Sequence, residues 1–319
     1  MPITSASMAP ETGPPGLRQT RIRAALVFRS RVIQAIRRFF ERHAYLEVET
    51  PHRLPTQAPE AHIDPQPSGE WFLQTSPELL MKRLLAAGYP RLFQVCRCHR
   101  RGERGRRHLP EFTLLEWYHA GMDYEDMMGE TEHLIGFVAG EVGLGPNLVY
   151  QGRALDLRPP WPRLSVATAF RRYGSLSMTD ALAADRFDEI MGLEIEPRLG
   201  RPRPVFLHDY PVLQGALARP RPGMPGIVER FELYIAGLEL CNAFSELTDP
   251  VQQRRRFEAE MGARRAAGKT VGPMPEKFLA ALEGMPQAAG NALGVDRLVM
   301  LLLDRAQIDD VVAFTPEEL

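Results

Sequence analysis

An arginine-rich loop between two alternating apolar segments is the feature that most constrains this chain. Residues 92–118 read LFQVCRCHRRGERGRRHLPEFTLLEWY. The positions that alternate onto one side of the first half are Leu92, Gln94, Cys96, Cys98 and Arg100, which is the period of two of a β-strand. Apolar and aromatic residues resume at Phe112, so we predict a hairpin. Its loop arginines then face either solvent or a polyphosphate, which guanidinium groups bind in bidentate geometry.

Length and composition exclude several classes of protein. The chain has 319 residues, 44% of them apolar, enough for one large or two modest domains with a sizeable core. A net charge of −1 argues against an obligate nucleic-acid binder with a broad basic face. No apolar run approaches the ~20 residues that span a bilayer, so we expect no membrane association. The three cysteines suit the reducing cytoplasm, and their spacing does not match a zinc site.

The periodicity of the remaining sequence predicts a mixture of helices and strands. Helices are expected over residues 26–42, 79–87, 123–142, 250–267 and 276–282, and after residue 297; strands are expected over 46–50, 71–75, 204–210, 230–236 and 238–244. We expect the charged 250–267 helix to present a solvated face. Residues 1–23 are predicted to be a disordered leader and residues 24–319 one folded domain, with a small helical insertion at about 143–203.

Charged residues also gather near the ends of these elements. Gly290 and Gly294 bracket a strand-to-helix transition, where glycine permits close backbone approach. Arg297 lies in the first turn of an otherwise apolar helix, so it either pairs with an internal acid or faces an anion. Three acids lie near the ends of other strands, namely Glu78, Glu239 and Glu246. Together with Arg100, this mixture suits a triphosphate, with arginines on phosphate oxygens and a carboxylate for Mg²⁺.

Glu78 has a purely structural explanation as well. Ser76 is suited to capping the helix over residues 79–87, and Pro77 suits its first position. Glu78 would then lie in the first turn, where the helix dipole favours an anion. The residue pattern alone leaves both interpretations open.

Several segments of the chain resemble the motifs of class II aminoacyl-tRNA synthetases, in the same order along the sequence. The helix and strand ending at Pro51 are similar to motif 1, the Arg100 hairpin to motif 2 and the GVDR helix to motif 3. The segments TSPELLMKRLL, PEFTLLEWY, GLELCNAFSELTD and ALGVDRLVMLLLD resemble the lysyl branch, and most of all its short paralogues that attach (R)-β-lysine to elongation factor P. The resemblance covers about residues 24–314. It implies an α+β fold, in which helices flank an antiparallel sheet, and a homodimer built on the motif 1 helix.

The resemblance also implies roles for individual residues. The amino-acid site would comprise Ser76, Pro77, Glu78, Tyr118 and Glu246, with Glu246 at the substrate amine. The ATP site would comprise Arg100, His108, Phe112, Glu239, Leu240, Gly294 and Arg297, with Glu239 holding Mg²⁺. Arg100 would contact the α-phosphate and Phe112 would stack on adenine. Arg100 and Arg297 would be catalytic, because they stabilise charge that develops as pyrophosphate leaves.

The sequence departs from the family pattern within motif 2. Arg101 and Gly102 occupy the places of an Asn-Glu pair, and Leu109 replaces an asparagine. The missing glutamate normally faces the adenine amine, so either Glu103 swings into its place or ATP binding is impaired.

One geometric difficulty concerns Glu239 and Glu246, which are seven residues apart and would face opposite sides of a regular strand. We therefore expect that strand to end or bulge near Phe244.

These features predict ATP-dependent activation of (R)-β-lysine or lysine and transfer to elongation factor P. Only about 23 residues precede the first predicted helix, whereas a lysyl-tRNA synthetase has an anticodon-binding domain there, so we expect no tight tRNA binding. One alternative is a stand-alone lysyl-type ligase that acts on tRNA or on another acceptor with an amine. A second alternative is a non-catalytic paralogue with a regulatory role, which the motif 2 departures favour.

Ala292 is the candidate determinant of substrate choice. Lysyl-tRNA synthetases read Gly-Leu-Gly-Ile-Gly where this chain has Gly290-Asn291-Ala292-Leu293-Gly294. By strand parity the Ala292 side chain shares a face with both bracketing glycines, so its methyl group should crowd an α-amine more than a β-amine. The alternative interpretation is that Ala292 only packs against a neighbouring strand.

Overall fold

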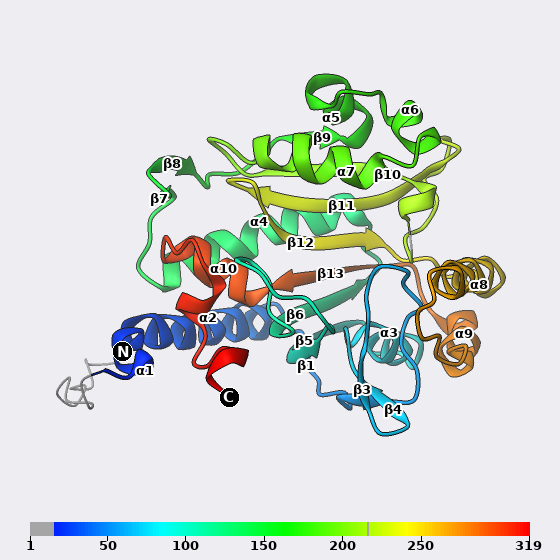
Figure 1. The fold of residues 1–319 in the computed structure, drawn as a ribbon, viewed down its shortest axis with the longest axis horizontal. Coiled ribbons are helices and arrows are strands. Elements are labelled where there is room, and N and C mark those ends of the chain that lie inside the picture. Colours follow the sequence, from blue (N-terminus) through cyan, green and yellow to red (C-terminus); the bar gives the residue numbers. More distant parts are fainter. Residues whose placement is uncertain (1–15, 216) are drawn as a thin grey trace.

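A mixed eight-stranded sheet forms the centre of the computed structural model, which describes residues 16–215 and 217–319 (Figure 1). In spatial order its strands are β1 (Leu46–Glu47), β5 (Arg91–His99), β6 (Glu111–Ala120), β13 (Ala288–Gly294), β12 (Leu238–Ser245), β11 (Ile227–Ile235), β10 (Val205–Pro211) and β9 (Arg163–Ser165). From β5 to β10 every neighbouring pair is antiparallel. The expected α+β fold is confirmed, with a correction at the edges, where β1 and β9 pair in parallel with their neighbours. Parallel pairing is open to these two strands because long connections separate each from its partner.

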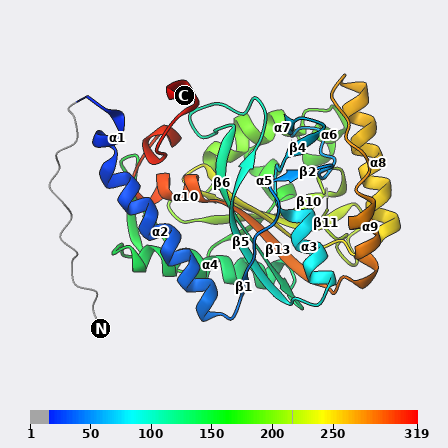
Figure 2. The same ribbon diagram turned by 90° about the horizontal axis from the view of Figure 1, so that it is seen from below.

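Helices cover both faces of this sheet (Figures 1 and 2). The α-helices are α1 (Arg18–Arg21), α2 (Arg23–Arg42), α3 (Glu78–Ala86), α4 (Tyr124–Glu141), α5 (Val166–Tyr173), α6 (Met178–Ala183), α7 (Phe187–Ile190), α8 (Pro250–Ala266), α9 (Glu276–Ala281) and α10 (Val295–Leu302). Three short strands form a second sheet, namely β2 (Arg53–Leu54), β4 (Trp71–Leu73) and β3 (Gln66–Ser68), and β7 (Asn147–Tyr150) pairs with β8 (Arg153–Asp156). In the described part of the chain, no helix is both long and apolar enough to cross a membrane.

The predicted hairpin is present, and its alternation separates the core from the cavity. Leu92 pairs with Tyr118, and the register continues to His99 and Glu111. The residues of one parity, such as Phe93 and Trp117, join the main hydrophobic core beneath α2 and α4. The residues of the other parity face α3 or the open side of the sheet. The period of two in the sequence therefore assigned the two faces correctly.

A buried ion pair joins the three predicted motifs. Asp296, at the start of α10, lies 2.5 Å from the Arg29 guanidinium of α2. Its second oxygen accepts a hydrogen bond from the backbone N–H of Thr113 on β6, at 2.7 Å, and Arg29 also donates to the Thr113 hydroxyl. Asp296 is only 2% exposed, and removing one partner from a buried pair of this kind is strongly destabilising. This contact fixes the start of α10 relative to the hairpin.

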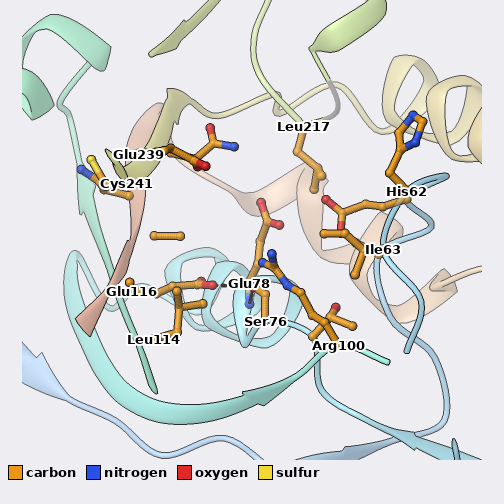
Figure 3. A pocket seen from close by; sticks show the side chains of 18 of the residues that line it. His62, Ile63, Ser76, Glu78, Arg100, Leu114, Glu116, Leu217, Glu239 and Cys241 are labelled. Carbon is orange, nitrogen blue, oxygen red and sulfur yellow. Dashed lines mark hydrogen bonds between the residues drawn. The ribbon is translucent and has the colours of Figure 1, made fainter. Parts of the chain in front are cut away.

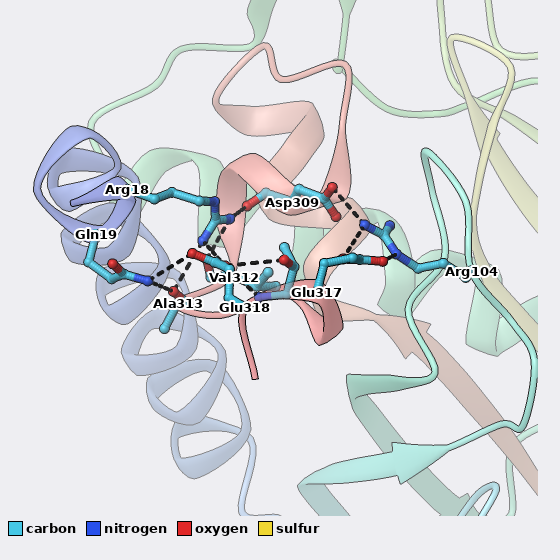
Figure 4. Close-up of polar contacts among 9 residues, drawn as sticks. Arg18, Gln19, Arg104, Asp309, Val312, Ala313, Glu317 and Glu318 are labelled. Atoms are coloured by element: carbon cyan, nitrogen blue, oxygen red, sulfur yellow. Dashed lines mark hydrogen bonds and ion pairs between the residues drawn. The ribbon is translucent and has the colours of Figure 1, made fainter. Parts of the chain in front are cut away.

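The two described ends of the chain lie together beside the arginine-rich loop (Figure 4). Arg18 donates hydrogen bonds to the carbonyls of Val312 and Ala313 and to the carboxylate of Glu318. The predicted leader over residues 1–23 is thus corrected in part: residues 1–15 lie outside the described residues, but residues 18–21 are helical. Composition did not reveal this helix because its partners lie almost 300 residues further along the chain.

Two further expectations differ from the structure. The 143–203 segment contains the helices α5 to α7, but also the β7–β8 hairpin and β9, and it shares a second hydrophobic core with β10 and β11. Helix α8 does not simply present a solvated face, because Phe257 and Arg264 are buried in it. Its apolar residues are too few to reveal this packing, and Arg264 is buried because it hydrogen-bonds a neighbouring loop.

Candidate active site

A cavity of about 440 Å³ opens on the face of the sheet opposite the main core (Figure 3). The predicted site residues that line it are Ser76, Glu78, Arg100, Glu103, His108, Phe112, Tyr118, Glu239, Leu240, Glu246, Ala292, Gly294 and Arg297. Pro77 does not line it. Pro77 is instead the N-cap of α3, a position predicted for Ser76, and the helix begins at Glu78, one residue before the predicted start; the Ser76 hydroxyl still accepts the Glu78 N–H at 3.0 Å. Segments far apart in the sequence thus converge, although their roles remain predictions.

One end of the cavity is basic. The guanidinium of Arg100 lies 5.0 Å from the centre of the Phe112 ring, and its Nε is buried with no hydrogen-bond partner among the described residues. Arg297 donates to the carbonyl of Glu239 at 2.8 Å and to its carboxylate at 3.1 Å. A second nitrogen of Arg297 lies 2.6 Å from Nε2 of His108. Burial and the nearby Arg297 charge lower the pKa of His108, so the neutral ring accepts this hydrogen bond.

The opposite end is acidic and deeply buried. Lys82 of α3 lies between two carboxylates: its Nζ is 2.5 Å from Glu78 and forms an ion pair with Glu246. Burial, partly offset by Lys82, raises the pKa of Glu246 to about 8. Glu116 accepts hydrogen bonds from the hydroxyls of Ser76 at 2.5 Å and Tyr118 at 2.9 Å. Burial and the charge of Glu78 raise the pKa of Glu116 to about 8 as well.

Gly290 gives the acidic end its shape. A Cβ at this position would lie 2.3 Å from Cε1 of Tyr118 and 2.5 Å from Oε1 of Glu246. At Gly294, by contrast, the nearest atoms belong to the Arg297 side chain at 3.8 Å, an ordinary contact. Of these two glycines, only Gly290 is required for the close approach of its neighbours.

The parity difficulty on β12 is resolved by a bulge. Leu233 of β11 pairs with Cys241, whereas the next residue, Tyr234, pairs with Glu239, so Leu240 is an extra residue on β12. The bulge returns Glu239 to the cavity side, in phase with Glu246. The strand ends at Ser245, next to Phe244, as expected. The bulge is at Leu240, four positions before Phe244.

The loop arginines have three different destinations. Arg100 faces the cavity, and Arg107 also lines it while donating to the Gly237 carbonyl at 2.8 Å. Arg104 instead pairs with Glu317 at 2.8 Å and Asp309 at 2.9 Å, near the C-terminus (Figure 4). The sequence indicated only solvent and a polyphosphate as partners of the loop arginines. The structure adds a third, the acidic residues of the C-terminal segment.

The motif 2 departures also have structural explanations. Gly102 has a φ of +79°, a left-handed conformation that favours glycine. Leu109 is buried and belongs to the main hydrophobic core, so its side chain has a packing role. Glu103 lines the cavity, and its carboxylate lies 3.9 Å from the Arg100 guanidinium. The displaced glutamate is therefore within the site, as the hypothesis requires.

Sequence reasoning missed several residues of the cavity, among them Lys82, Arg107, Glu116 and Glu60. Strand parity could have identified Glu116, because it shares a face with Phe112 and Tyr118. Glu60 had no comparable signal. It lies in a proline-rich loop without periodicity, and only the fold brings it to the site.

The fold and the site together define a class II tRNA synthetase catalytic domain. A family model described as tRNA synthetases class II (D, K and N) matches residues 15–318, and the chain belongs to this family. The chain is 40% identical to proteins named lysine–tRNA ligase from Anaeromyxobacter sp. (strain K) and Moorella thermoacetica, over 92% of its own length and 65% of theirs. A lysine–tRNA ligase from Nostoc sp. is 38% identical, over 94% of this chain and 57% of the relative. The chain thus spans less than two thirds of the length of these relatives.

Proposed function

We propose that this protein uses ATP to activate a lysine-type diamino acid as an adenylate and transfers it to an amine acceptor. One observation carries the proposal: a single cavity has arginines at one end and buried carboxylates at the other. ATP and a diammonium amino acid need these two environments side by side. The names of the relatives, lysine–tRNA ligases, agree with this substrate class.

The basic end would stabilise the transition state of activation. The carboxylate oxygen of the amino acid attacks the α-phosphorus of ATP, the bond to the bridging oxygen breaks, and pyrophosphate leaves. Arg100 is stacked on Phe112, and its Nε has no hydrogen-bond partner among the described residues, so it is suited to the negative charge that grows on the α-phosphate. Arg297 and His108 would hold the outer phosphates after Arg297 exchanges its internal partners for phosphate oxygens.

Glu239 fits a nucleotide-bound Mg²⁺. In the described part of the chain, no group of three or more His, Cys, Asp or Glu residues is arranged to hold a metal by itself. Mg²⁺ with a nucleotide commonly uses one or two protein carboxylates besides phosphate and water. Glu239 lies at the cavity wall beside Arg297 and is exposed enough to serve. The ion would neutralise charge on the phosphates.

The acidic end would bind the ammonium groups. Glu78, Glu116 and Glu246 lie around the buried cation Lys82. When all three are ionised, the carboxylates exceed the charge of Lys82 by two, which matches the two ammonium groups of the substrate. Without a ligand this excess is unfavourable, and the raised pKa values of Glu116 and Glu246 reflect that cost.

We propose (R)-β-lysine as the preferred isomer, on the basis of Ala292. In the sheet register Ala292 lies opposite Glu116 and Asn242, and all three line the cavity. Ala292 also packs against the small cluster that contains Cys98 and Leu114, so the packing interpretation accounts for part of its environment. A methyl-sized contact is worth about 1–3 kcal/mol, or ~10–200-fold in discrimination.

The substitution Ala292→Gly tests this preference. We expect the wild type to use (R)-β-lysine with the higher kcat/KM in pyrophosphate exchange, and the variant to narrow the gap by improving α-lysine. Equal use of both isomers by the wild type, or an unchanged ratio in the variant, would remove Ala292 from the specificity argument.

For the acceptor we propose a lysine side chain of elongation factor P, because the four sequence motifs resemble most closely the paralogues that modify it. The competing acceptor is tRNA, which the names of the relatives favour. The decisive experiment incubates the protein with ATP, each lysine isomer, and either purified elongation factor P or lysine tRNA. A gain of one aminoacyl mass on the factor, without tRNA charging, is expected.

Pyrophosphate exchange separates the catalytic from the regulatory hypothesis. The absence of exchange with every lysine isomer would favour a non-catalytic paralogue.

We also propose a homodimer through α2, which lies along the outer side of the molecule in Figure 2. Light scattering of the purified protein should give twice the chain mass of 35.9 kDa.

A further inference from the structure

The loop formed by residues 55–65, between β2 and β3, contributes a wall of the cavity. Glu60, His62 and Ile63 line the cavity, and Figure 3 shows the last two on the side opposite Glu239 and Cys241. The loop is attached to the basic end, because Arg101 donates its backbone N–H to the carbonyl of Asp64 at 2.7 Å. A bridge between Pro65 and Arg100 continues this attachment. The loop therefore lies where the basic end meets the acidic end.

Helix α8 holds this loop in place. The buried guanidinium of Arg264 donates to the carbonyls of Glu60 and Ile63, both at 2.7 Å. The carboxylate of Glu260, one turn earlier, accepts the N–H of Ala61 at 2.7 Å. An arginine that is 5% exposed needs partners for its donors, and here the loop backbone supplies them. The position of Glu60 is thus fixed on both sides of its backbone.

The carboxylate of Glu60 has no hydrogen-bond donor of its own among the described residues. It lies within electrostatic range of Glu78 and Arg100, and also of Glu260 and Arg230. Burial and the charge of Glu78 raise its pKa to about 7. An ionised acid that is half-buried in the same cavity as a second acid, and that accepts no hydrogen bond, is unfavourable unless a cation binds near both.

We propose that Glu60, together with Glu78, binds the substrate ammonium group nearest the reacting carboxylate and so determines which amino acids are activated. The inference rests on the proposed function. Arg100 marks the position of the α-phosphate, so the groups beside it face the carboxyl end of the amino acid. Tyr118 and Glu246 form the remote end and are left for the distal ammonium, whereas Glu116 lies two residues nearer Phe112 on β6, opposite Ala292. Glu60 and Glu246 would then read the two amines separately.

The test compares a lysine isomer with ε-aminocaproate, which lacks the proximal amine of both α-lysine and β-lysine. In Glu60→Gln, which keeps the size of the side chain, we expect binding of the lysine isomer by calorimetry to weaken by about tenfold or more, as for a lost charged contact. Binding of ε-aminocaproate should stay unchanged. The KM for ATP and the melting temperature should also stay near wild type, because the Glu60 side chain forms no hydrogen bond or ion pair in the described part of the chain.

Glu70→Gln is the matched control, since Glu70 is an exposed acid beyond the same loop and outside the cavity. It should bind both compounds like the wild type. Equal weakening of both compounds in Glu60→Gln, or no weakening of either, would overturn the inference. If the wild type activates no lysine isomer, the proposed function fails; if the wild type is active and Glu60→Gln matches it, only this inference fails.

Discussion

The basic and acidic ends of the cavity differ in how much of their geometry exists before a substrate binds. At the basic end, the side chains of Arg297 and Glu239 are 18% and 37% exposed and satisfy each other. At the acidic end, the side chains of Lys82 and Glu246 are 2% and 0% exposed. The residues of the basic end come from a loop, from the bulge beside Glu239 and from a helix start, whereas two of the three carboxylates of the acidic end, Glu116 and Glu246, lie on or directly after a packed strand. We infer that the acidic end selects the substrate and the basic end rearranges around phosphates.

The largest expected effect breaks the basic end. Arg100→Ala and Arg297→Ala should each lower the rate of pyrophosphate exchange by about 10²-fold or more, because in the proposed mechanism each arginine stabilises the charge of the transition state. Melting temperatures should change little, since neither arginine belongs to the buried core. Arg104→Ala is the control, because Arg104 belongs to the same loop but pairs with the C-terminal segment. Unfolding of either test variant would show that its arginine is structural.

A steric change should break the acidic end alone. In Gly290→Ala the new methyl group would collide with Tyr118 and Glu246, and overpacking of this kind costs about 1–3 kcal/mol. We expect the KM for the amino acid to rise by ~10- to 100-fold, with little change in the KM for ATP. Gly294→Ala has room for its methyl group and serves as the comparison. Similar kinetics for the two variants would contradict the assignment of the ends.

The pH dependence of substrate binding should distinguish the two ends further. The carboxyl of Glu116, with a pKa of about 8, is protonated at neutral pH in the empty site, whereas Glu246 is paired with Lys82. An ammonium ligand requires Glu116 to be ionised, so binding releases a proton and the KM for the amino acid should fall as pH rises toward 8, by up to about tenfold per pH unit. The KM for ATP should lack this slope. Calorimetry in buffers of different ionisation enthalpy measures the protons directly.

The same shifts predict the pH dependence of stability. A carboxyl whose folded pKa is about 8 binds its proton more tightly in the native state than in the unfolded state, where the pKa is ordinary. The empty protein should therefore be most stable at pH values below the ordinary carboxyl pKa of the unfolded chain. Its free energy of unfolding should fall as the pH rises from there through about 8. Glu116→Gln should flatten this slope. If the Tm of the wild type instead rises from pH 6 to pH 8 and that of Glu116→Gln does not, the pKa of Glu116 is not raised in the folded protein.

The smallest expected effect concerns the displaced glutamate. Glu103→Ala should raise the KM for ATP by roughly three- to tenfold, about the contribution of one hydrogen bond, and leave the KM for the amino acid unchanged. Glu103 lies on the cavity wall near Arg100, within reach of a nucleotide but outside the acidic end. An unchanged KM for ATP would show that Glu103 does not replace the missing motif 2 residue.

The local pattern of the sequence determined the elements and their faces. Alternation in residues 92–100 predicted the first strand of the hairpin and the set of side chains that share a face with Leu92 and Gln94, because a side-chain period of two is a property of the strand itself. The apolar spacing predicted α2 to within a few residues of its observed start at Arg23. The ordered motifs predicted the α+β fold and placed Arg100 and Arg297 in one site.

Only the tertiary structure decided how these pieces meet. The bulge at Leu240 depends on the register with β11, and the burial of Arg264 depends on the carbonyls of the 55–65 loop. Arg104 is paired with acids that lie more than 200 residues away along the chain. In the same way, Glu116 and Glu60 have raised pKa values because other segments bury them and place Glu78 nearby. Such contacts join residues with no local periodicity between them, so they arise from the packing of distant segments and carry no signal in the sequence around each residue.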